Sequence, residues 1–196
     1  MPPTLDELTW PKRTERLLIR ASDDTDATTT FRYRRLPEVT TWLPRHIDDL
    51  AAYVEMFDKP ERRDTTLVIE HEGVVVGDLM LRVEDPWSQS EVAEQARGTV
   101  AELGWSFDPA YGGRGLATEA VTELLRIAFD EVGVRRVVAL CFADNEPSWR
   151  LMERVGMRRE AHTIADSLHR SGAWLDGFEY ALLADEWRAA RVSRRA

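Results

Sequence analysis

The sequence predicts an α/β fold with a central mixed, mostly antiparallel sheet of about six to seven strands and helices on both faces. Two observations predict it. Short β-branched runs alternate with amphipathic helical patterns along the chain. In addition, two strand–helix units follow one another, 99–107 with 117–131 and 134–142 with 146–155, as in sheets that contain parallel strands.

Length and composition indicate one folded domain. The chain has 196 residues, of which 43% are hydrophobic and 31% charged, so it can bury a core without disulfides. We expect a single domain over 15–190, an N-terminal extension over 1–14 and a basic tail over 191–196.

Charge and hydropathy exclude several classes of protein. The net charge is −9, with no long basic run, so nucleic acid is a poor partner. No apolar run approaches the roughly 20 residues that span a bilayer, and the first residues lack the pattern of a signal peptide. Cys141 is the only cysteine, so no intrachain disulfide forms. We therefore expect a cytoplasmic protein without membrane contact.

The first half of the chain predicts a strand, two helices and a hairpin. Residues 16–20 form an apolar strand between charges, and 25–36 predicts a helix that ends before a proline. Leu50, Tyr53 and Val54 have helical spacing within 48–57. The β-branched runs 65–71 and 74–83 flank Glu72-Gly73 and predict an antiparallel hairpin.

Next come an acidic segment and two strand–helix units. Residues 84–98 predict either a flexible insertion or a functional loop. Glu102 falls on the more polar face of the alternating strand 99–107. The helix over 117–131 ends before Gly133. The nearly continuous apolar run 134–142 predicts an interior strand covered on both faces.

The end of the chain predicts a short helix and two strands. Asn145 is expected to cap the helix over 146–155, with Pro147 in its first turn and Gly156 past its end. Two more strands are expected, over 159–168 and 178–183.

A glycine-rich segment between strand 99–107 and helix 117–131 carries the clearest chemical signal. Gly112, Gly113 and Gly115 let the backbone turn sharply, and the following helix presents unpaired N–H groups and the positive end of its dipole. This combination suits a pyrophosphate. The spacing fits neither a triphosphate P-loop nor a dinucleotide motif, and an ordinary glycine-rich turn remains the alternative.

These motifs together resemble the GNAT family of acyl-CoA-dependent N-acyltransferases. The resemblance covers about 15–187. Within the family, the sequence is similar to the branch that contains the ribosomal-protein N-terminal acetyltransferases RimJ and RimL. It rests on the following segments: Leu17-Leu18-Ile19-Arg20, Tyr111-Gly112-Gly113-Arg114-Gly115-Leu116-Ala117-Thr118-Glu119-Ala120, Asn145-Glu146-Pro147-Ser148, Gly156-Met157 and Asp185-Glu186-Trp187.

The resemblance implies a GNAT fold and a site for acetyl-CoA or another acyl-CoA. Backbone amides of the loop would bind the pyrophosphate, strands 99–107 and 134–142 would flank the pantetheine arm, and Asn145 would contact the same arm. The first loop position is Gly112, where much of the family has Gln or Arg. The residues expected to bind the cofactor are Trp105, Ser106, Phe107, Gly112, Gly113, Arg114, Gly115, Leu116, Ala117, Thr118, Asn145 and Ser148.

The same resemblance implies direct acyl transfer to an amine. Many GNAT enzymes have a tyrosine that acts as the general acid where this chain has Met152. In the RimJ/RimL-like branch a serine one turn earlier is the candidate proton donor to the departing thiolate, and Ser148 occupies that place here. Glu102 is the first candidate for the base. The late glutamate of the ribosomal branch is missing near Ser167-Leu168, and Asp166, His162 or His169 are the substitutes. Ordinary structural roles are open for all of these residues.

Other expectations concern the acceptor and the assembly. Trp42 and Trp87, with the carboxylates of 84–98, would line a pocket for a cationic primary amine or a protein N-terminus. Cys141 is expected to pack rather than to react, and no metal is expected. Dimers are frequent in the family, so a homodimer is one expectation. Two alternatives stay open: a non-catalytic acyl-CoA-binding or regulatory module, and a structural domain without nucleotide.

Overall fold

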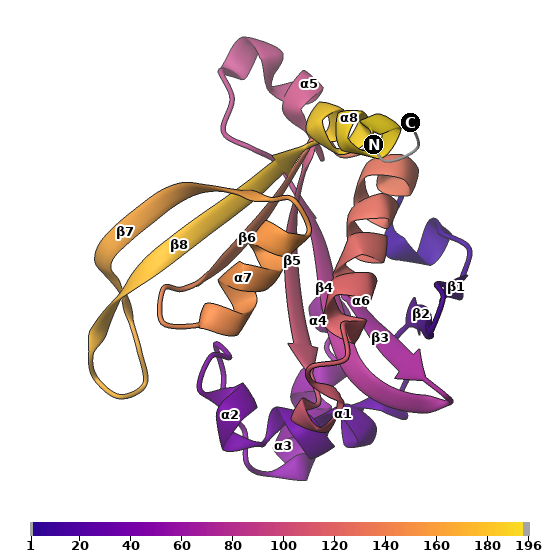
Figure 1. The fold of residues 1–196 in the computed structure, drawn as a ribbon, viewed down its shortest axis with the longest axis vertical. Helices are drawn as coiled ribbons and strands as arrows, with labels where there is room; N and C mark the ends of the chain where they lie inside the picture. The colour runs from indigo at the N-terminus through magenta and orange to yellow at the C-terminus, as the bar shows by residue number, and fades with distance from the viewer. Residues whose placement is uncertain (1, 194–196) are drawn as a thin grey trace. The chain divides into compact units, whose positions relative to one another are not determined.

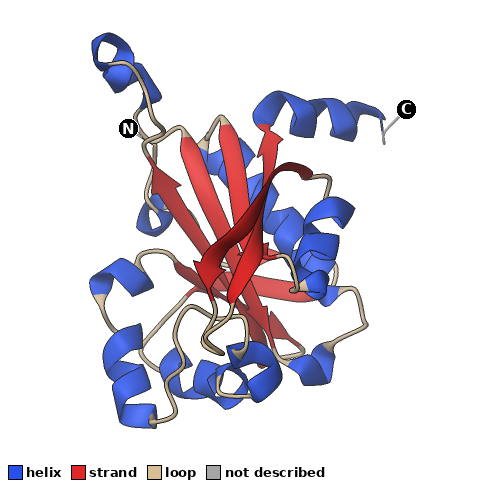
Figure 2. Cartoon of the chain, turned by 90° about the vertical axis from the view of Figure 1, so that its left-hand side faces the viewer, coloured by secondary structure: helices blue, strands red, loops and turns tan. Residues whose placement is uncertain are grey.

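The computed structural model describes residues 2–193, and within them eight strands form one sheet, slightly more than the sequence predicts. The strands, red in Figure 2, follow the order β1-β2-β3-β4-β5-β6-β8-β7. β5 and β6 are parallel, whereas β1–β2, β2–β3, β3–β4, β6–β8 and β7–β8 are antiparallel. The mixed, mostly antiparallel sheet of the prediction is thus confirmed. The strand bounds are Lys12–Arg13 (β1), Leu17–Ala21 (β2), Thr66–His71 (β3), Val74–Glu84 (β4), Val100–Phe107 (β5), Arg136–Phe142 (β6), Arg158–Leu168 (β7) and Trp174–Leu183 (β8).

Helical elements occupy much of the remaining chain. The α-helices are Asp26–Arg34 (α1), Pro37–Thr40 (α2), Leu50–Phe57 (α3), Pro60–Arg63 (α4), Ala93–Ala96 (α5), Leu116–Arg126 (α6), Glu146–Arg154 (α7) and Ala184–Ser193 (α8). Short 3₁₀ turns cover Leu5–Glu7, Ser90–Val92 and Pro109–Tyr111. A π-helical turn, Ile127–Val132, follows α6 and ends at Gly133, whose N–H donates to the carbonyl of Ala128.

The described residues fall into two units. Unit 1 contains Pro2, Arg82–Leu103 and residues 125–193, and unit 2 contains Pro3–Leu81 and Gly104–Leu124. Of the basic tail expected over 191–196, residues 191–193 end α8 and residues 194–196 lie outside the described residues. The single domain over 15–190 and the extension over 1–14 stay predictions.

Unit 2 pairs strands with a group of helices. The predicted strand 16–20, the hairpin around Glu72-Gly73 and the first two helices are confirmed as β2, β3–β4, α1 and α3. α1, α2 and α3 lie close together in Figure 1. The apolar face of α1 packs on α3 through Ala27, Phe31, Tyr53 and Phe57, all of which are buried. This burial holds α1 in place, because a nine-residue helix is marginal on its own in water.

Unit 1 is built on β6, β8 and β7. Helix α7 covers one face of this part of the sheet, as Figure 1 shows. The buried ring of Tyr180 in β8 points to that face, and its hydroxyl donates to Glu153 of α7 over 2.9 Å. The predicted strands 159–168 and 178–183 and the helix over 146–155 are therefore confirmed, with β8 beginning four residues earlier.

The prediction that strand 134–142 is covered on both faces is wrong. Val137 and Ala139 are fully buried, but the intervening Leu140 is 58% exposed. Alternate side chains of a strand point to opposite faces, and in unit 1 helix α7 packs on the Val137 side. The apolar run therefore fills one covered face and one open face.

The acidic segment 84–98 is more ordered than a plain loop. It contains the turn Ser90–Val92 and helix α5, and its ends are tied by a 2.7 Å hydrogen bond from the Gly98 N–H to the Asp85 carboxylate. Glu84 pairs with Arg82 and Glu94 with Arg97. Three of its carboxylates are thus already bound within the chain.

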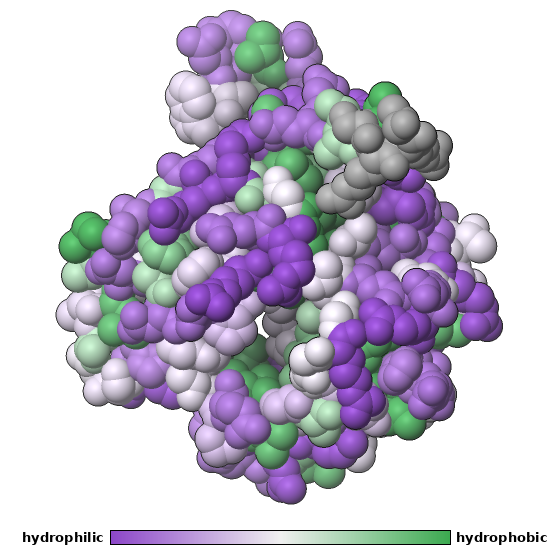
Figure 3. All heavy atoms as spheres, viewed as in Figure 1, coloured by the Kyte–Doolittle hydropathy of each residue, from purple (hydrophilic) through white to green (hydrophobic). Residues whose placement is uncertain are grey.

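Hydrophilic residues dominate the face seen in Figure 3, and hydrophobic residues appear there in small separate groups. Of the seven tryptophans, Trp87 and Trp174 are strongly exposed. Within residues 2–193, no helix combines the length and the apolar character that a membrane crossing requires.

Candidate active site

In unit 2, Asp108 fixes the point at which β5 ends and the glycine-rich loop begins. Its buried carboxylate accepts a hydrogen bond from the Ala110 N–H and pairs with Arg32 over 3.0 Å. Its own N–H donates to the carbonyl of Val76 in β4. The start of the loop is therefore anchored to the neighbouring strand and to helix α1.

The loop itself presents backbone amides to solvent. Gly113 and Gly115 have φ values of +73° and +77°, which side chains with a Cβ rarely adopt. Neither amide has an acceptor among the described residues, and Ala117 lies in the first turn of α6, where N–H groups have no helical partner. Exposed N–H groups at the start of an eleven-residue helix can bind an anion.

Glu119 in α6 ties this loop to the strand β2 region. Its carboxylate accepts hydrogen bonds from the Thr14 hydroxyl (2.5 Å) and from the backbone N–H and Nε of Arg16 (2.8 and 2.7 Å). Arg16 Nη1 also donates to the Arg114 carbonyl over 2.8 Å. Burial opposes ionisation of Glu119, but these bonds outweigh it and lower its pKa. The loop is therefore held in its shape without any ligand.

Arg114 extends from the loop over the ring of Tyr111. Its guanidinium lies 5.3 Å from the ring centroid, and Tyr111 in turn contacts His71 edge to face. No carboxylate of the described residues pairs with Arg114, so its positive charge is available next to the free amides.

Backbones approach closely beside the predicted arm-binding residues. A Cβ on Gly77 of β4 would lie 2.7 Å from the carbonyl oxygen of Ser106, which only glycine avoids. Ser106 is buried, and Trp105 and Phe107 are half-buried. Residues 105–107 therefore belong to the packed part of unit 2.

In unit 1, Ser148 and Cys141 are in contact. The Ser148 hydroxyl, in the first turn of α7, donates a hydrogen bond to the Cys141 sulfur. Burial raises the pKa of the Cys141 thiol to about 11, and the bond from Ser148 opposes that rise only in part. Cys141 is therefore a neutral thiol at neutral pH, in line with the expectation that it packs.

Glu102 lies on the opposite face of β6 from this pair. It is aligned with Val138 in the parallel pairing of β5 with β6, and Val138 is three residues from Cys141. An odd separation along a strand places two side chains on opposite faces. The Glu102 carboxylate pairs with Arg82, which also binds Glu84.

The register separates the three substitute bases. Asp166 lies against Gly177, whose cross-strand partner Phe142 is on the Glu102 face of β6, and the His169 ring contacts Phe142. His162 is instead aligned with Phe178 and, through it, with Cys141. Unit 1 therefore brings Asp166 and His169 to the face of Glu102, and His162 to the face of Ser148.

Comparisons with known proteins bear on this geometry. Residues 16–158 match the acetyltransferase (GNAT) domain family. The chain belongs to the GNAT family. It is 28% identical over 177 residues to the uncharacterized N-acetyltransferase YnaD of Bacillus subtilis, which covers 89% of this chain and 97% of the relative. It is 30% identical over 89 residues, 45% of each chain, to the [ribosomal protein uS5]-alanine N-acetyltransferase of Escherichia coli.

Solved structures agree with the GNAT fold. A GNAT-family acetyltransferase of Bacillus anthracis has a TM-score of 0.76 and 27% identity and covers 90% of this chain and 100% of its own. The ribosomal L7/L12 acetyltransferase RimL, solved with coenzyme A in a disulfide with a cysteine, has a TM-score of 0.74 at 16% identity, over 88% and 97% of the two chains. The chain is thus a GNAT N-acetyltransferase, a family that uses acetyl-CoA.

The structure adds detail to two positions of the α7 segment, Asn145 and Met152. Asn145 is the N-cap residue of α7 as predicted, but its side chain makes no capping hydrogen bond. The amide is therefore available to a ligand. Met152 is buried on the inner face of α7, where it packs and donates no proton.

The two tryptophans expected at the acceptor pocket have different surroundings. Trp42 is half-buried in the segment after α2, within unit 2. Trp87 belongs to unit 1 and is 91% exposed, so almost nothing packs against its ring. Within residues 2–193 no group of three or more His, Cys, Asp or Glu side chains is arranged to hold a metal ion.

Sequence reasoning missed several partners of the site. Arg16 and Arg82 lie far along the chain from the residues they bind, Glu119 and Glu102, and no local pattern indicates either pair. Asp176 was missed as well: it binds His162 Nε2 over 2.8 Å and accepts the Ala165 N–H. The Ala165 and His162 bonds lower the pKa of Asp176.

Proposed function

We propose that this GNAT N-acetyltransferase moves an acyl group, acetyl in the first instance, from acyl-CoA directly to a primary amine. The loop at the start of α6 carries the proposal. Its free amides at Gly113 and Gly115, the first turn of α6 and the Arg114 charge form a self-contained anion site in unit 2. We assign the pyrophosphate of acyl-CoA to this site.

For the remainder of the cofactor we propose two further contacts. The backbone of residues 105–107 binds the pantetheine arm as an added strand, and the free amide of Asn145 binds it as well. We place the thioester sulfur by Cys141 and Ser148, because the Ser148 hydroxyl already donates a hydrogen bond to a sulfur atom there.

We assign the proton transfers to side chains on two faces of β6. Glu102 takes a proton from the amine, and Ser148, already a donor to a sulfur atom, donates to the departing thiolate. In this arrangement the amine attacks the thioester from the Glu102 face of β6, and the CoA thiolate departs on the Ser148 face. Asp166 shares the face of Glu102 and is the alternative base.

The acceptor that we propose is a protein N-terminus or a small amine. A protein N-terminus is supported by the similarity to the uS5-alanine enzyme, whereas the net charge of −9 favours cationic amines. Trp42 and Trp87 are the proposed acceptor contacts. A reaction in the cytoplasm suits a chain with one cysteine, and a homodimer is the proposed assembly.

Calorimetric titration and a thiol-release assay test this function. We expect acetyl-CoA to bind, and the rate of CoA release to depend on an added amine from a panel of N-terminal peptides and polyamines. Succinyl-CoA and free CoA identify the acyl group. Binding without release from any amine would favour a non-catalytic acyl-CoA-binding module, and absence of binding would refute the loop assignment.

A further inference from the structure

Two arginines in unit 2 share one buried carboxylate. Asp78 of β4 is 3% exposed, and it receives hydrogen bonds from the Tyr33 hydroxyl (2.7 Å) and from Arg34 Nη1. The second arginine, Arg62 of α4, comes only to 3.7 Å of the same carboxylate, beyond hydrogen-bond distance. Two positive charges therefore face one negative charge.

Arg62 is the unsatisfied member of this cluster. Its side chain is 24% exposed, and its buried Nε has no hydrogen-bond partner. Burial, followed by repulsion from Arg34, lowers its pKa. A guanidinium that loses water without gaining hydrogen bonds is unfavourable, so the folded chain keeps Arg62 there at a cost in stability.

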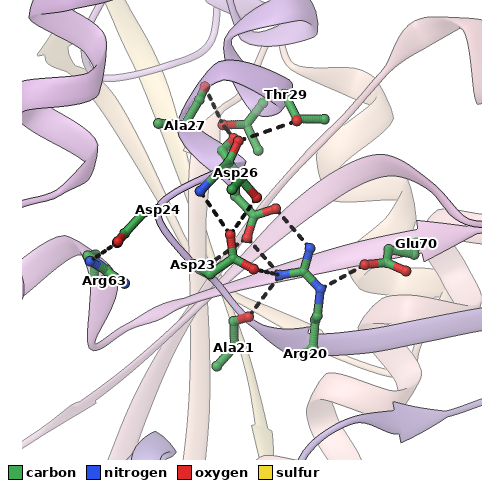
Figure 4. Close-up of polar contacts among 11 residues, drawn as sticks. Arg20, Ala21, Asp23, Asp24, Asp26, Ala27, Thr29, Arg63 and Glu70 are labelled. Atoms are coloured by element: carbon green, nitrogen blue, oxygen red, sulfur yellow. Dashed lines mark hydrogen bonds and ion pairs between the residues drawn. The ribbon is translucent and has the colours of Figure 1, made fainter.

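Arg20, in the same unit, has hydrogen-bond acceptors around its guanidinium. Figure 4 shows its guanidinium bound to Asp26, Glu70 and the Ala21 carbonyl, and Asp26 forms two of these bonds, at 2.7 and 2.9 Å. The chain thus places carboxylates around an arginine that it needs for structure. Around Arg62 the described residues offer one carboxylate, Asp78, and it lies beyond hydrogen-bond distance.

The place of Arg62 connects it to the proposed reaction. Asp78 and Met80 point to the same face of β4, and a Cβ on Gly104 of β5 would lie 3.6 Å from the Met80 Cβ. The Asp78–Arg62 pair therefore lies on the face that Gly104 shares with Ser106, one of the proposed contacts of the pantetheine arm. We propose that Arg62 binds a carboxylate group carried by a substrate of the transfer reaction. A carboxylate accepts two parallel hydrogen bonds from a guanidinium and would balance the excess charge. The proposal rests on the proposed function, because it assigns the carboxylate to a substrate of acyl transfer.

Stability without any ligand is the first test. Replacing Arg62 by an apolar chain of similar length, Arg62→Met, should raise the melting temperature by at least about 2 °C, because it removes a poorly compensated buried charge. The matched control is Arg63→Met, which loses the same charge from the adjacent residue but only a surface ion pair with Asp24 (Figure 4). A lower melting temperature for Arg62→Met than for Arg63→Met would overturn the proposal.

Carboxylate binding is the second test, with succinate against chloride at equal ionic strength. Succinate should raise the melting temperature of the wild type and of Arg63→Met, and not that of Arg62→Met. Arg62→Lys, which keeps the charge and loses the planar fork, should respond more weakly than the wild type. An equal succinate response in all four proteins would refute the site. This readout needs no acyl transfer, so it stands even if the proposed function fails.

Turnover distinguishes the two sources of the carboxylate. A preference for succinyl-CoA over acetyl-CoA places it on the acyl group, and a preference for a free dipeptide over its C-terminal amide places it on the acceptor. One of these preferences should be about tenfold or more, be lost in Arg62→Lys and persist in Arg63→Met. No preference in either pair, with turnover intact, would overturn the proposal.

Discussion

At the scale of single residues, Arg82 decides what Glu102 can do. Arg82 pairs with Glu102 and also binds Glu84, so Glu102 must give up part of this ion pair when it accepts a proton from the amine. Because side chains on both faces of β6 take part in the proposal, neither Glu102 nor Ser148 alone accounts for the whole transfer.

Glu102→Gln tests the base. General base catalysis contributes about 100-fold or more, so we expect kcat at neutral pH to fall by about that factor and the acid limb of the pH–rate profile to flatten. Glu84→Gln is the control, since it also loses a bond to Arg82 but is not a proposed base. An unchanged profile for Glu102→Gln would move the base to Asp166.

Cys141 should behave as a buried thiol. Its raised pKa, about 11, means that the neutral thiol persists through pH 7 to 10 and the reactive thiolate appears only near pH 11. We expect slow alkylation at pH 7 that accelerates steadily up to that pH, and Cys141→Ala should keep its turnover. Ser148→Ala, in contrast, should lower kcat. Fast alkylation at neutral pH together with an inactive Cys141→Ala would indicate a covalent route instead.

At the scale of elements, the loop before α6 is a ligand site that is already formed. Arg16 binds both Glu119 and the Arg114 carbonyl, and Asp108 binds the Ala110 N–H, so both ends of the loop are fixed. Binding an anion therefore requires little ordering of the chain. Preorganisation of this kind strengthens binding because the loss of loop entropy has occurred on folding.

Gly115→Val tests the loop. Valine at a φ of +77° is strained, and relaxation would displace the amides that we assign to the pyrophosphate. Affinity for acetyl-CoA should fall by about tenfold or more, since a loss of about 1.4 kcal/mol already gives that factor. Gly172→Val, at a φ of +86° in the turn between β7 and β8, imposes similar strain and should keep the affinity. Unchanged affinity for Gly115→Val would contradict the assignment.

At the scale of the whole molecule, the two units are joined by continuous elements. β4, β5 and α6 each contribute residues to both, so neither unit is a separable piece of sequence. We therefore expect one cooperative unfolding transition for the chain.

Acetyl-CoA should shift that transition upward. At a concentration of about 100 times Kd, a ligand specific for the folded state adds about 2.7 kcal/mol, which corresponds to about 5–10 °C for a chain of this size. Differential scanning calorimetry with and without acetyl-CoA measures the shift, and Gly115→Val at the same concentration should shift less. Absence of a shift at saturation, or two separate transitions, would contradict this expectation.

The sequence by itself determined the fold class, most of the strands and helices, and the glycine loop. These features depend on local patterns: β-branched runs in β3 and β4, alternation in β5, helical spacing in α3 and α6, and glycines next to a helix start. The GNAT motifs that led to the family are also local, because they lie within single strand–turn–helix segments.

Only the tertiary structure decided which face and which partner each residue has. Leu140 was expected inside and is exposed, because its covering helix packs on one side of β6 only. Glu102 and Ser148 lie on opposite faces of β6 because the register with β5 aligns Glu102 with Val138, whereas Ser148 contacts Cys141, three residues further along β6. The binding partners of Arg16, Arg82 and Asp78 are distant in sequence. Local sequence patterns do not predict such long-range contacts.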